Sequence, residues 1–178
     1  MNLALIGYRG TGKTTVARLL TLRLGWTWID TDVEVELRAA KPIATIFAED
    51  GEPAFRNLEA TVIEELASRE KVVLALGGGA ILRAKTREIL ARTCFVAWLK
   101  ASPRTLFERL AADATHADQR PNLTAKGGLA EIEEVLARRE PVYRASAAAE
   151  VDTEGRTPAE VAQTVHDQFA TMLSREPA

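Results

Sequence analysis

The sequence has little cysteine, little histidine and no long apolar run. Cys94 is the only cysteine among the 178 residues, so no intramolecular disulfide can form, which is typical of a reducing compartment. The two histidines, His116 and His166, do not stand at the spacing of metal ligands. No apolar run approaches the length of a membrane span, and Met1 leads directly into the first apolar segment without a signal peptide. We therefore expect a cytoplasmic protein that does not enter membranes.

The chain also lacks an excess of charge of either sign. It has 23 Lys and Arg residues against 25 Asp and Glu residues, a formal net charge of −2, and its basic residues are scattered. Because non-specific nucleic-acid binding needs clustered basic side chains, we do not expect nucleic acid as a partner. The apolar fraction of 47% and the charged fraction of 27% are ordinary for an α/β protein. The length suits a single domain that covers residues 1–178.

A glycine-rich motif stands near the amino terminus. Residues 7–14 read Gly-Tyr-Arg-Gly-Thr-Gly-Lys-Thr and match G-x-x-x-x-G-K-[ST], the pattern of a phosphate-binding P-loop. An apolar run at 3–6 precedes the motif, and a segment with helical periodicity at 15–24 follows it. This order of strand, loop and helix favours a P-loop over a turn that only links two elements. Lys13 is expected to reach the β- and γ-phosphates of a nucleotide, and the Thr14 hydroxyl to bind Mg²⁺.

Strand and helix signals alternate along the rest of the chain. Such alternation predicts an α/β fold in which helices cover both faces of a parallel sheet. The later strands are predicted at 26–29, 72–76, 94–99 and, weakly, within 147–152. The later helices are predicted at 33–39, 42–50, 52–68, 81–92, 102–112, 129–139 and 158–173, and we expect Pro141 to interrupt the sixth of these. The segment 113–128 lacks apolar periodicity, and a polar loop of this length is usually functional or mobile.

Two carboxylates follow the second predicted strand. If Asp30 and Asp32 both continue that strand, the alternation of side chains places them on the same side. The carboxyl end of a strand is where open α/β sheets bind ligands. One carboxylate could then orient the Mg²⁺ shell while the other accepts a proton from a hydroxyl nucleophile. The alternative is that the two residues only cap the helix that follows.

Three consecutive glycines, Gly77, Gly78 and Gly79, follow the most apolar predicted strand. Consecutive glycines expose backbone N–H groups and let a ligand approach closely, whereas a tight turn would usually need only one. This strand end carries no acidic residue, so Asp30 is the better candidate for the metal site.

Three arginines could bind anions. A guanidinium group binds carboxylate or phosphate at two points, which Arg56 and Arg139 could do, although an arginine of this kind taken alone is more often a surface charge. Arg120, followed by Pro121 within the polar loop, could bring a positive charge to a transferring phosphoryl group. From the residues alone, the sequence indicates a P-loop phosphotransferase of a small acceptor.

The order of these motifs resembles the shikimate kinase family, which is related to the nucleoside monophosphate kinases. The resemblance covers nearly the whole chain and rests on an ordered set of short matches. They are the P-loop, Asp30-Thr31-Asp32, Ile46-Phe47 through Gly51-Glu52, Phe55-Arg56 with Glu59, Gly77-Gly78-Gly79, Arg120-Pro121, Arg139-Glu140-Pro141-Val142-Tyr143 and Val151-Asp152-Thr153. The polar loop departs from the family pattern Arg-Pro-Leu-Leu, since Asn122 and Leu123 follow Pro121 here.

The resemblance implies a three-layer α/β/α P-loop kinase with a five-stranded parallel sheet. It implies a helical substrate-binding segment at about 32–60 and a mobile lid at about 112–125. The implied reaction is the ATP-dependent phosphorylation of the 3-hydroxyl of shikimate, which feeds aromatic amino-acid synthesis. Mg²⁺ is the implied cofactor, shikimate and ATP are the implied partners, and we expect a monomer.

The resemblance also implies roles for individual residues. The catalytic residues would be Lys13, Asp32 and Arg120, with Asp32 as the candidate base. The ATP contacts would come from Gly10, Thr11, Gly12, Lys13, Thr14, Thr15, Arg109, Arg120 and Arg156. The shikimate contacts would come from Asp32, Arg56, Gly78, Gly79 and Arg139, with Glu59 supporting Arg56. The metal ligands would be Thr14 and Asp30, the latter through water.

Three rival functions fit part of the pattern. A pair of arginines suits a nucleotide phosphate as well as a carboxylate, so a nucleoside monophosphate kinase is one rival. A gluconate-type sugar kinase is another. The third is a kinase-like binding protein that has lost catalysis, but such a protein would be expected to lack Lys13, Asp32 or Arg120, and all three are present.

Overall fold

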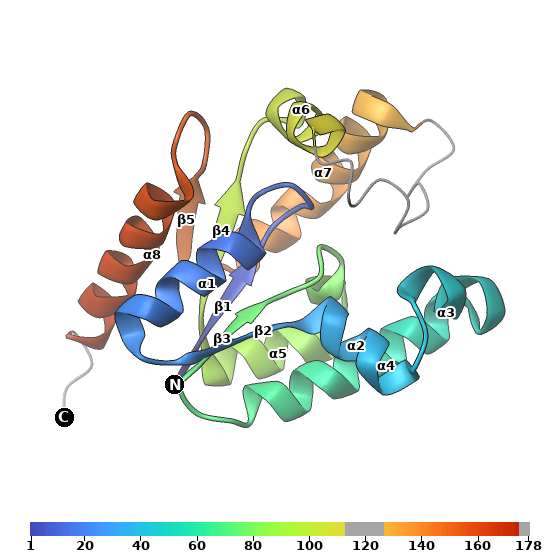
Figure 1. Ribbon diagram of the computed structural model, residues 1–178, viewed down its shortest axis with the longest axis horizontal. Coiled ribbons are helices and arrows are strands. Elements are labelled where there is room, and N and C mark those ends of the chain that lie inside the picture. Colours follow the sequence, from blue (N-terminus) through green and yellow to red (C-terminus); the bar gives the residue numbers. More distant parts are fainter. Residues whose placement is uncertain (113–126, 175–178) are drawn as a thin grey trace.

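The computed structural model describes residues 1–112 and 127–174. In these residues five parallel strands form one sheet in the order β2-β3-β1-β4-β5 (Figure 1). The strands are β1 (Asn2–Ile6), β2 (Thr27–Asp30), β3 (Val72–Ala75), β4 (Cys94–Lys100) and β5 (Ala149–Asp152). The predicted α/β fold with a five-stranded parallel sheet is confirmed.

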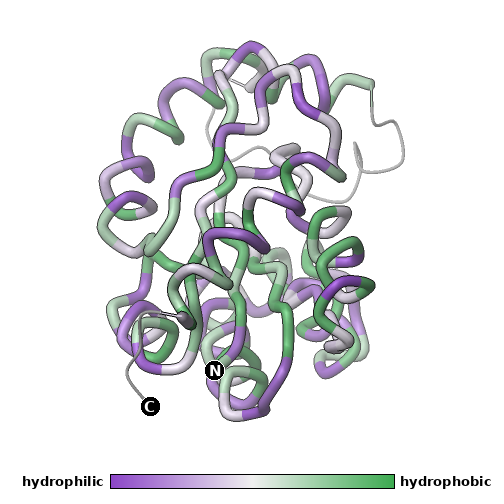
Figure 2. Tube along the Cα trace, turned by 90° about the vertical axis from the view of Figure 1, so that its left-hand side faces the viewer, coloured by the Kyte–Doolittle hydropathy of each residue, from purple (hydrophilic) through white to green (hydrophobic). Residues whose placement is uncertain are grey.

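Helices cover both faces of this sheet, as alternation of strands and helices predicts. On one face, α1 (Lys13–Leu24) and α8 (Pro158–Leu173) pack against one side of β1, β3 and β4. On the other face lie α4 (Gly51–Ala67), α5 (Ala84–Thr93) and the carboxyl-terminal part of α7 (Gly128–Ser146). Hydrophobic residues follow the central strands, while the helices alternate between hydrophobic and hydrophilic residues (Figure 2). The central strands β1, β3 and β4 are therefore buried on both sides, whereas the edge strands β2 and β5 are partly exposed.

Shorter helices surround the carboxyl ends of the strands. They are α2 (Thr31–Ala39), α3 (Ile43–Glu49), the 3₁₀ helix η1 (Ala80–Leu82) and α6 (Pro103–Ala112). The helical segment predicted at about 32–60 corresponds to α2, α3 and the first part of α4. The predicted lid at about 112–125 lies outside the described residues except for its first position. No described helix is both long and apolar enough to cross a membrane.

The register of the strands brings three segments to one edge of the sheet. Leu5 of β1 and Asp30 of β2 both pair with Ala75 of β3. The three strands therefore end at the same level, and the segments that follow them meet there. These segments are the glycine motif at 7–14, the start of α2 and the glycines at 77–79.

Several predicted boundaries were wrong. β2 ends at Asp30 and α2 begins at Thr31, so Asp32 lies in the first turn of a helix and not at the end of a strand. The predicted helix at 81–92 is a 3₁₀ turn followed by α5. Pro141 lies inside α7, which continues to Ser146. Proline removes one N–H donor from a helix, but the apolar packing beyond it, including buried Tyr143, holds the last turns in place.

Candidate active site

The glycine motif forms a tight loop between β1 and α1. Gly7, Gly10 and Gly12 all have positive φ, at 139°, 81° and 87°, and α1 begins directly afterwards at Lys13. Gly7 also has no room for a side chain, because a Cβ atom there would lie 2.3 Å from the Leu99 carbonyl oxygen. The positive end of the α1 dipole therefore faces the loop, which suits an anion.

Lys13 folds across this loop. Its Nζ atom donates to the carbonyl oxygens of Gly7 at 3.0 Å and Tyr8 at 2.8 Å. The Thr11 hydroxyl also donates to the Tyr8 carbonyl oxygen, at 2.8 Å. The ammonium group is thus held at the P-loop, where it would bind phosphate together with the backbone N–H groups of the loop.

Asp30 joins β2 to the start of α1. One of its carboxylate oxygens, Oδ2, accepts a hydrogen bond of 2.7 Å from the Thr14 hydroxyl. The other, Oδ1, accepts from the backbone N–H of Asp32 at 3.0 Å, so Asp30 is the N-cap of α2. Asp30 thus caps α2 as the alternative interpretation expected, but its other carboxylate oxygen contacts Thr14 at the P-loop, so capping does not exclude the predicted metal role.

The pair formed by Thr14 and Asp30 supplies the oxygen donors that Mg²⁺ prefers. The described residues contain no group of three His, Cys, Asp or Glu side chains that could hold a metal ion. A site of this kind fits Mg²⁺ bound to a nucleotide, which takes few protein ligands and keeps phosphate and water oxygens.

Asp32 reaches the glycine turn at 77–79, but for a different reason from the predicted strand alternation. A Cβ atom at Gly77 would lie 2.5 Å from Asp32 Oδ1 and 2.9 Å from Glu59 Oε1. The Thr31 hydroxyl, which is fully buried, accepts a hydrogen bond of 3.1 Å from the Gly77 N–H. The start of α2 is thereby fixed against the turn that follows β3.

The next two glycines lie beside the two predicted arginines. A Cβ atom at Gly79 would lie 2.7 Å from Nη2 and 2.8 Å from Nη1 of Arg56, so only glycine leaves room for this guanidinium group. A Cβ atom at Gly78 would make ordinary contacts, 3.6 Å from Arg139 Nη1 and 3.4 Å from the Gly7 carbonyl oxygen. Each of the three glycines thus borders a different predicted site residue.

Arg56 is held by carboxylates of its own helix. Its Nη1 atom is 2.9 Å from Oε2 of Glu59, whose side chain is only 3% exposed. Glu52 accepts a second contact at 3.2 Å on the exposed side. A buried carboxylate needs a paired charge, so Glu59 fixes the guanidinium group at the turn. The interpretation of Arg56 as a solvated surface charge is therefore not supported.

Arg139 reaches the same turn from α7. Its Nη1 atom donates to the Gly78 carbonyl oxygen at 3.1 Å, and the Tyr143 hydroxyl donates to the same oxygen at 2.5 Å. Tyr143 is fully buried, and burial raises the pKa of its hydroxyl to about 12. Tyr143 is therefore protonated at neutral pH and can donate this hydrogen bond.

A further contact, not predicted from the sequence, joins the P-loop to α7. Nη2 of Arg9 is 3.0 Å from Oε1 of Glu131, whose side chain has no exposed surface. Neighbouring Tyr8 is also buried, and desolvation raises the pKa of its hydroxyl. A glutamate in an amphipathic helix carries no signal of burial, so sequence reasoning could not have found this pair.

Of the three arginines predicted to contact ATP, Arg109 and Arg156 lie in the described part of the chain. Nη1 of Arg109 donates to the Gly10 carbonyl oxygen at 3.3 Å, and its Nη2 donates to the Thr153 carbonyl oxygen at 2.8 Å. The Arg156 guanidinium group instead binds within its own turn, to the carbonyl oxygens of Asp152 and Glu160. Arg109 is thus joined to the P-loop, whereas these contacts of Arg156 are not.

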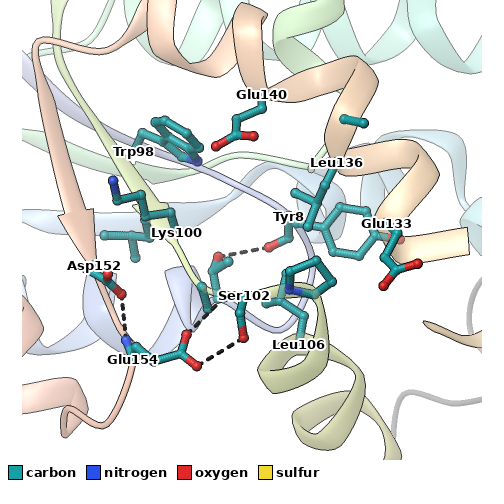
Figure 3. A pocket seen from close by; sticks show the side chains of 15 residues that line it. Tyr8, Trp98, Lys100, Ser102, Leu106, Glu133, Leu136, Glu140, Asp152 and Glu154 are labelled. Carbon is teal, nitrogen blue, oxygen red and sulfur yellow. Dashed lines mark hydrogen bonds between the residues drawn. The ribbon is translucent and has the colours of Figure 1, made fainter. Parts of the chain in front are cut away.

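A cavity of about 550 Å³ lies behind the P-loop, between β4, α6 and α7 (Figure 3). Trp98, Leu106 and Leu136 form apolar parts of its lining. Polar side chains of the lining form hydrogen bonds with neighbouring protein groups. For example, Glu154 accepts from the backbone N–H of Ser102 at 2.9 Å. This cavity is separate from the group of side chains at the glycine turn.

The geometry therefore brings together most of the predicted site. Asp32, Arg56 and Arg139 converge on the turn at 77–79, and Gly78 lies against the P-loop that holds Lys13. Arg120 lies outside the described residues, so its predicted role stays a prediction.

Known proteins match the chain over most of its length. The sequence model of the shikimate kinase family matches residues 9–170. Shikimate kinase from Rhodopirellula baltica is 45% identical over 90% of this chain and 86% of its own length. Shikimate kinase from Symbiobacterium thermophilum is 40% identical over 95% of this chain and 96% of its own length. The structure of shikimate kinase from Acinetobacter baumannii in complex with shikimate superposes with a TM-score of 0.88, at 34% identity, over 99% of this chain and 95% of that one. The chain belongs to the shikimate kinase family.

Proposed function

We propose that this chain transfers the terminal phosphoryl group of ATP to the 3-hydroxyl of shikimate, giving shikimate 3-phosphate and ADP for aromatic amino-acid synthesis. Besides membership of the family, one observation supports the proposal. A carboxylate, Asp32, and two guanidinium groups, Arg56 and Arg139, border one glycine turn that touches the P-loop. An acceptor with a carboxylate and several hydroxyls suits this combination of charges.

The acceptor would be held at the turn by positively charged guanidinium groups and by a negatively charged carboxylate. Arg56 and Arg139 would bind its carboxylate, and the backbones of Gly78 and Gly79 can approach it closely. Asp32 would accept a hydrogen bond from the reacting hydroxyl and then its proton. The hydroxyl oxygen forms the new bond to the γ-phosphorus as the bond from that phosphorus to the β,γ-bridging oxygen breaks, and ADP leaves.

The nucleotide would be bound by the loop and its neighbours. Backbone N–H groups of the motif, from Gly10 to Thr15, would surround the phosphates, and Lys13 would neutralise their charge. Arg120 would stabilise the transferring group. Arg109 and the turn at Arg156 would flank the adenine.

Mg²⁺ would be bound at Thr14 and Asp30, the latter through water. When present, the ion neutralises phosphate charge and orients the terminal group. The hydrogen bond between Thr14 and Asp30 supports this assignment, because it places both oxygen donors beside the P-loop.

An acceptor panel tests the proposed function. The full chain is assayed for ADP release with ATP and Mg²⁺ in the presence of shikimate, gluconate or a nucleoside monophosphate, and the product is identified by mass spectrometry. We expect turnover with shikimate only. Preferential phosphorylation of gluconate or of a nucleotide would select one of the rival kinases, and binding without turnover would favour a kinase-like binding protein.

A further inference from the structure

The carbonyl oxygen of Gly78 is the point at which α7 meets the acceptor turn. It accepts hydrogen bonds from both Arg139 and Tyr143, at 3.1 Å and 2.5 Å. A carbonyl oxygen has two lone pairs, so these two donors use its full capacity. Arg139 and Tyr143 are four residues apart and thus lie on the same face of the helix.

Tyr143 is held rigidly from its other side. Its ring stacks on Trp98 of β4, with ring centroids 5.7 Å apart and an interplanar angle of 22°. The whole side chain is buried, and Trp98 is 2% exposed. The direction of the hydroxyl is therefore set by the packing of β4 and α7, and not by the local turn.

Within the described part of the chain, the turn that Tyr143 contacts has backbone bonds of its own only at Gly77 and Gly79, whose carbonyl oxygens accept from the N–H groups of Ala80 and Leu82 at 3.0 Å each. Three consecutive glycines lose more backbone entropy on ordering than other residues, so fixed partners must hold them. Thr31 binds the N–H of Gly77, at the start of the turn. Tyr143 and Arg139 bind the carbonyl oxygen of Gly78, in its middle.

We infer that Tyr143 is a positioning residue for the acceptor, acting through the carbonyl group of Gly78. Its hydroxyl fixes the orientation of the peptide between Gly78 and Gly79, and so the position of the Gly79 N–H. By filling one lone pair of the carbonyl oxygen, it also fixes which side of that oxygen Arg139 can occupy. The inference rests on the proposed function, since the acceptor is the molecule that Arg139 and this turn would hold.

Replacing the hydroxyl alone tests the inference. Tyr143→Phe keeps the stacked ring and removes one donor from the Gly78 oxygen. We expect the acceptor KM to rise about fivefold to tenfold, as the loss of one buried hydrogen bond would give. The ATP KM should change by less than about twofold, because the P-loop keeps its own hydrogen bonds. Acceptor affinity measured calorimetrically without nucleotide should fall in parallel with the rise in KM.

Trp98→Phe is the matched control. Phenylalanine keeps an aromatic ring against the same tyrosine and retains the Tyr143 hydroxyl, so this variant should lower the melting temperature and raise the acceptor KM less than Tyr143→Phe does. An unchanged acceptor KM in Tyr143→Phe would overturn the inference. The inference would also be overturned if Tyr143→Phe and Trp98→Phe raised the acceptor KM and the ATP KM to the same extent, because that pattern indicates only a structural role. If the wild-type chain itself fails to phosphorylate shikimate, the proposed function fails first, and this outcome is distinguishable from either result.

Discussion

At the scale of single residues, the acceptor site depends on missing side chains as much as on charged ones. At two of the three glycines of the turn, a Cβ atom would lie within 3 Å of a charged side chain: Asp32 and Glu59 at Gly77, and Arg56 at Gly79. Charged groups can approach this closely only because the backbone there carries no side chain. Gly77 and Gly79 are therefore required for steric reasons that come from α2 and α4.

Adding one methyl group tests this steric argument. In Gly79→Ala the new Cβ would lie within 2.8 Å of both Arg56 Nη atoms, so the guanidinium group must move. Because a hydrogen bond to a charged group is worth about 1.5–3 kcal/mol, we expect the acceptor KM to rise about tenfold to a hundredfold. The ATP KM should stay within about twofold of the wild-type value. Leu82→Ala, at an exposed position just beyond the turn, is the control and should leave both constants unchanged. Wild-type kinetics in Gly79→Ala would show that Arg56 does not need its observed position.

Sequence reasoning identified the chemistry of these residues better than their partners. Lys13 and Thr14 are fixed by a motif whose spacing determines its geometry, and the structure places both at the loop. Arg56 looked like a surface charge, because the burial of Glu59 depends on tertiary packing that no local pattern records. For the same reason the pair of Arg9 and Glu131 was not predicted.

At the scale of elements, the beginning of α2 connects three parts of the site. Asp30 contacts Thr14 at the start of α1, Thr31 binds the N–H of Gly77, and Asp32 lies against the same glycine. The sequence predicted that Asp30 and Asp32 act at one edge of the sheet. It assigned them to a strand, because the helix boundary is set by the cap at Asp30 and not by a change in apolar periodicity.

Removing the Thr31 hydroxyl should weaken this connection. Thr31→Val keeps the shape of the buried side chain but leaves the Gly77 N–H without its acceptor, which costs about 1–3 kcal/mol of unfolding free energy. Urea denaturation measures the loss, and kinetics should show a higher acceptor KM. Thr61→Val, whose hydroxyl makes an exposed bond within α4, should change neither by a comparable amount. Equal unfolding free energies of Thr31→Val and wild type would contradict the proposed connection between Thr31 and the glycine turn.

The connection between β5 and α8 provides a test that depends on pH. The Ser102 backbone N–H and then the Thr105 hydroxyl bond to Glu154 and hold the pKa of its carboxyl group below the ordinary value of 4.5. A lowered pKa in the folded state contributes stability above the unfolded pKa, and this contribution is lost as the pH falls through the folded pKa.

Glu154→Gln should therefore be less stable than wild type at neutral pH, and the difference should shrink below about pH 4.5. Urea midpoints measured across this range check the prediction. Glu108→Gln, which removes an exposed i,i+4 ion pair in α6, is a suitable comparison. A difference that grows as the pH falls would contradict the assigned direction of the shift.

At the scale of the whole molecule, two hydrophobic clusters share one sheet. Ala4 and Ile6 of β1 face the cluster under α4 and α5, while Leu3 and Leu5 face the cluster under α1 and α8. Because the same strands contribute residues to both clusters, unfolding of one cluster would also expose the other. The overall α/β class was predictable because it follows from the alternation of elements, whereas the order β2-β3-β1-β4-β5 follows from long-range pairing that no local pattern contains.

We therefore predict a single cooperative unfolding transition, as expected of one domain. Trp98 lies in one cluster, and Trp26 packs against the other. Fluorescence of each tryptophan, isolated by replacing the other two with Phe, should give transitions that coincide with circular dichroism. For the expected monomer, the midpoint should not depend on protein concentration. Two separated transitions, or a midpoint that rises with concentration, would contradict these expectations.

The central claim is that shikimate is phosphorylated at the turn beside Asp32. The most direct measurement is shikimate-dependent ADP release by wild type and by Asp32→Asn, with shikimate affinity determined in parallel. We predict clear turnover by the wild type, a kcat about a hundredfold or more lower in the variant, and little change in affinity, because proton acceptance is lost while shape is kept. No shikimate-dependent ADP release by the wild type, or an unchanged kcat in Asp32→Asn, would contradict the account.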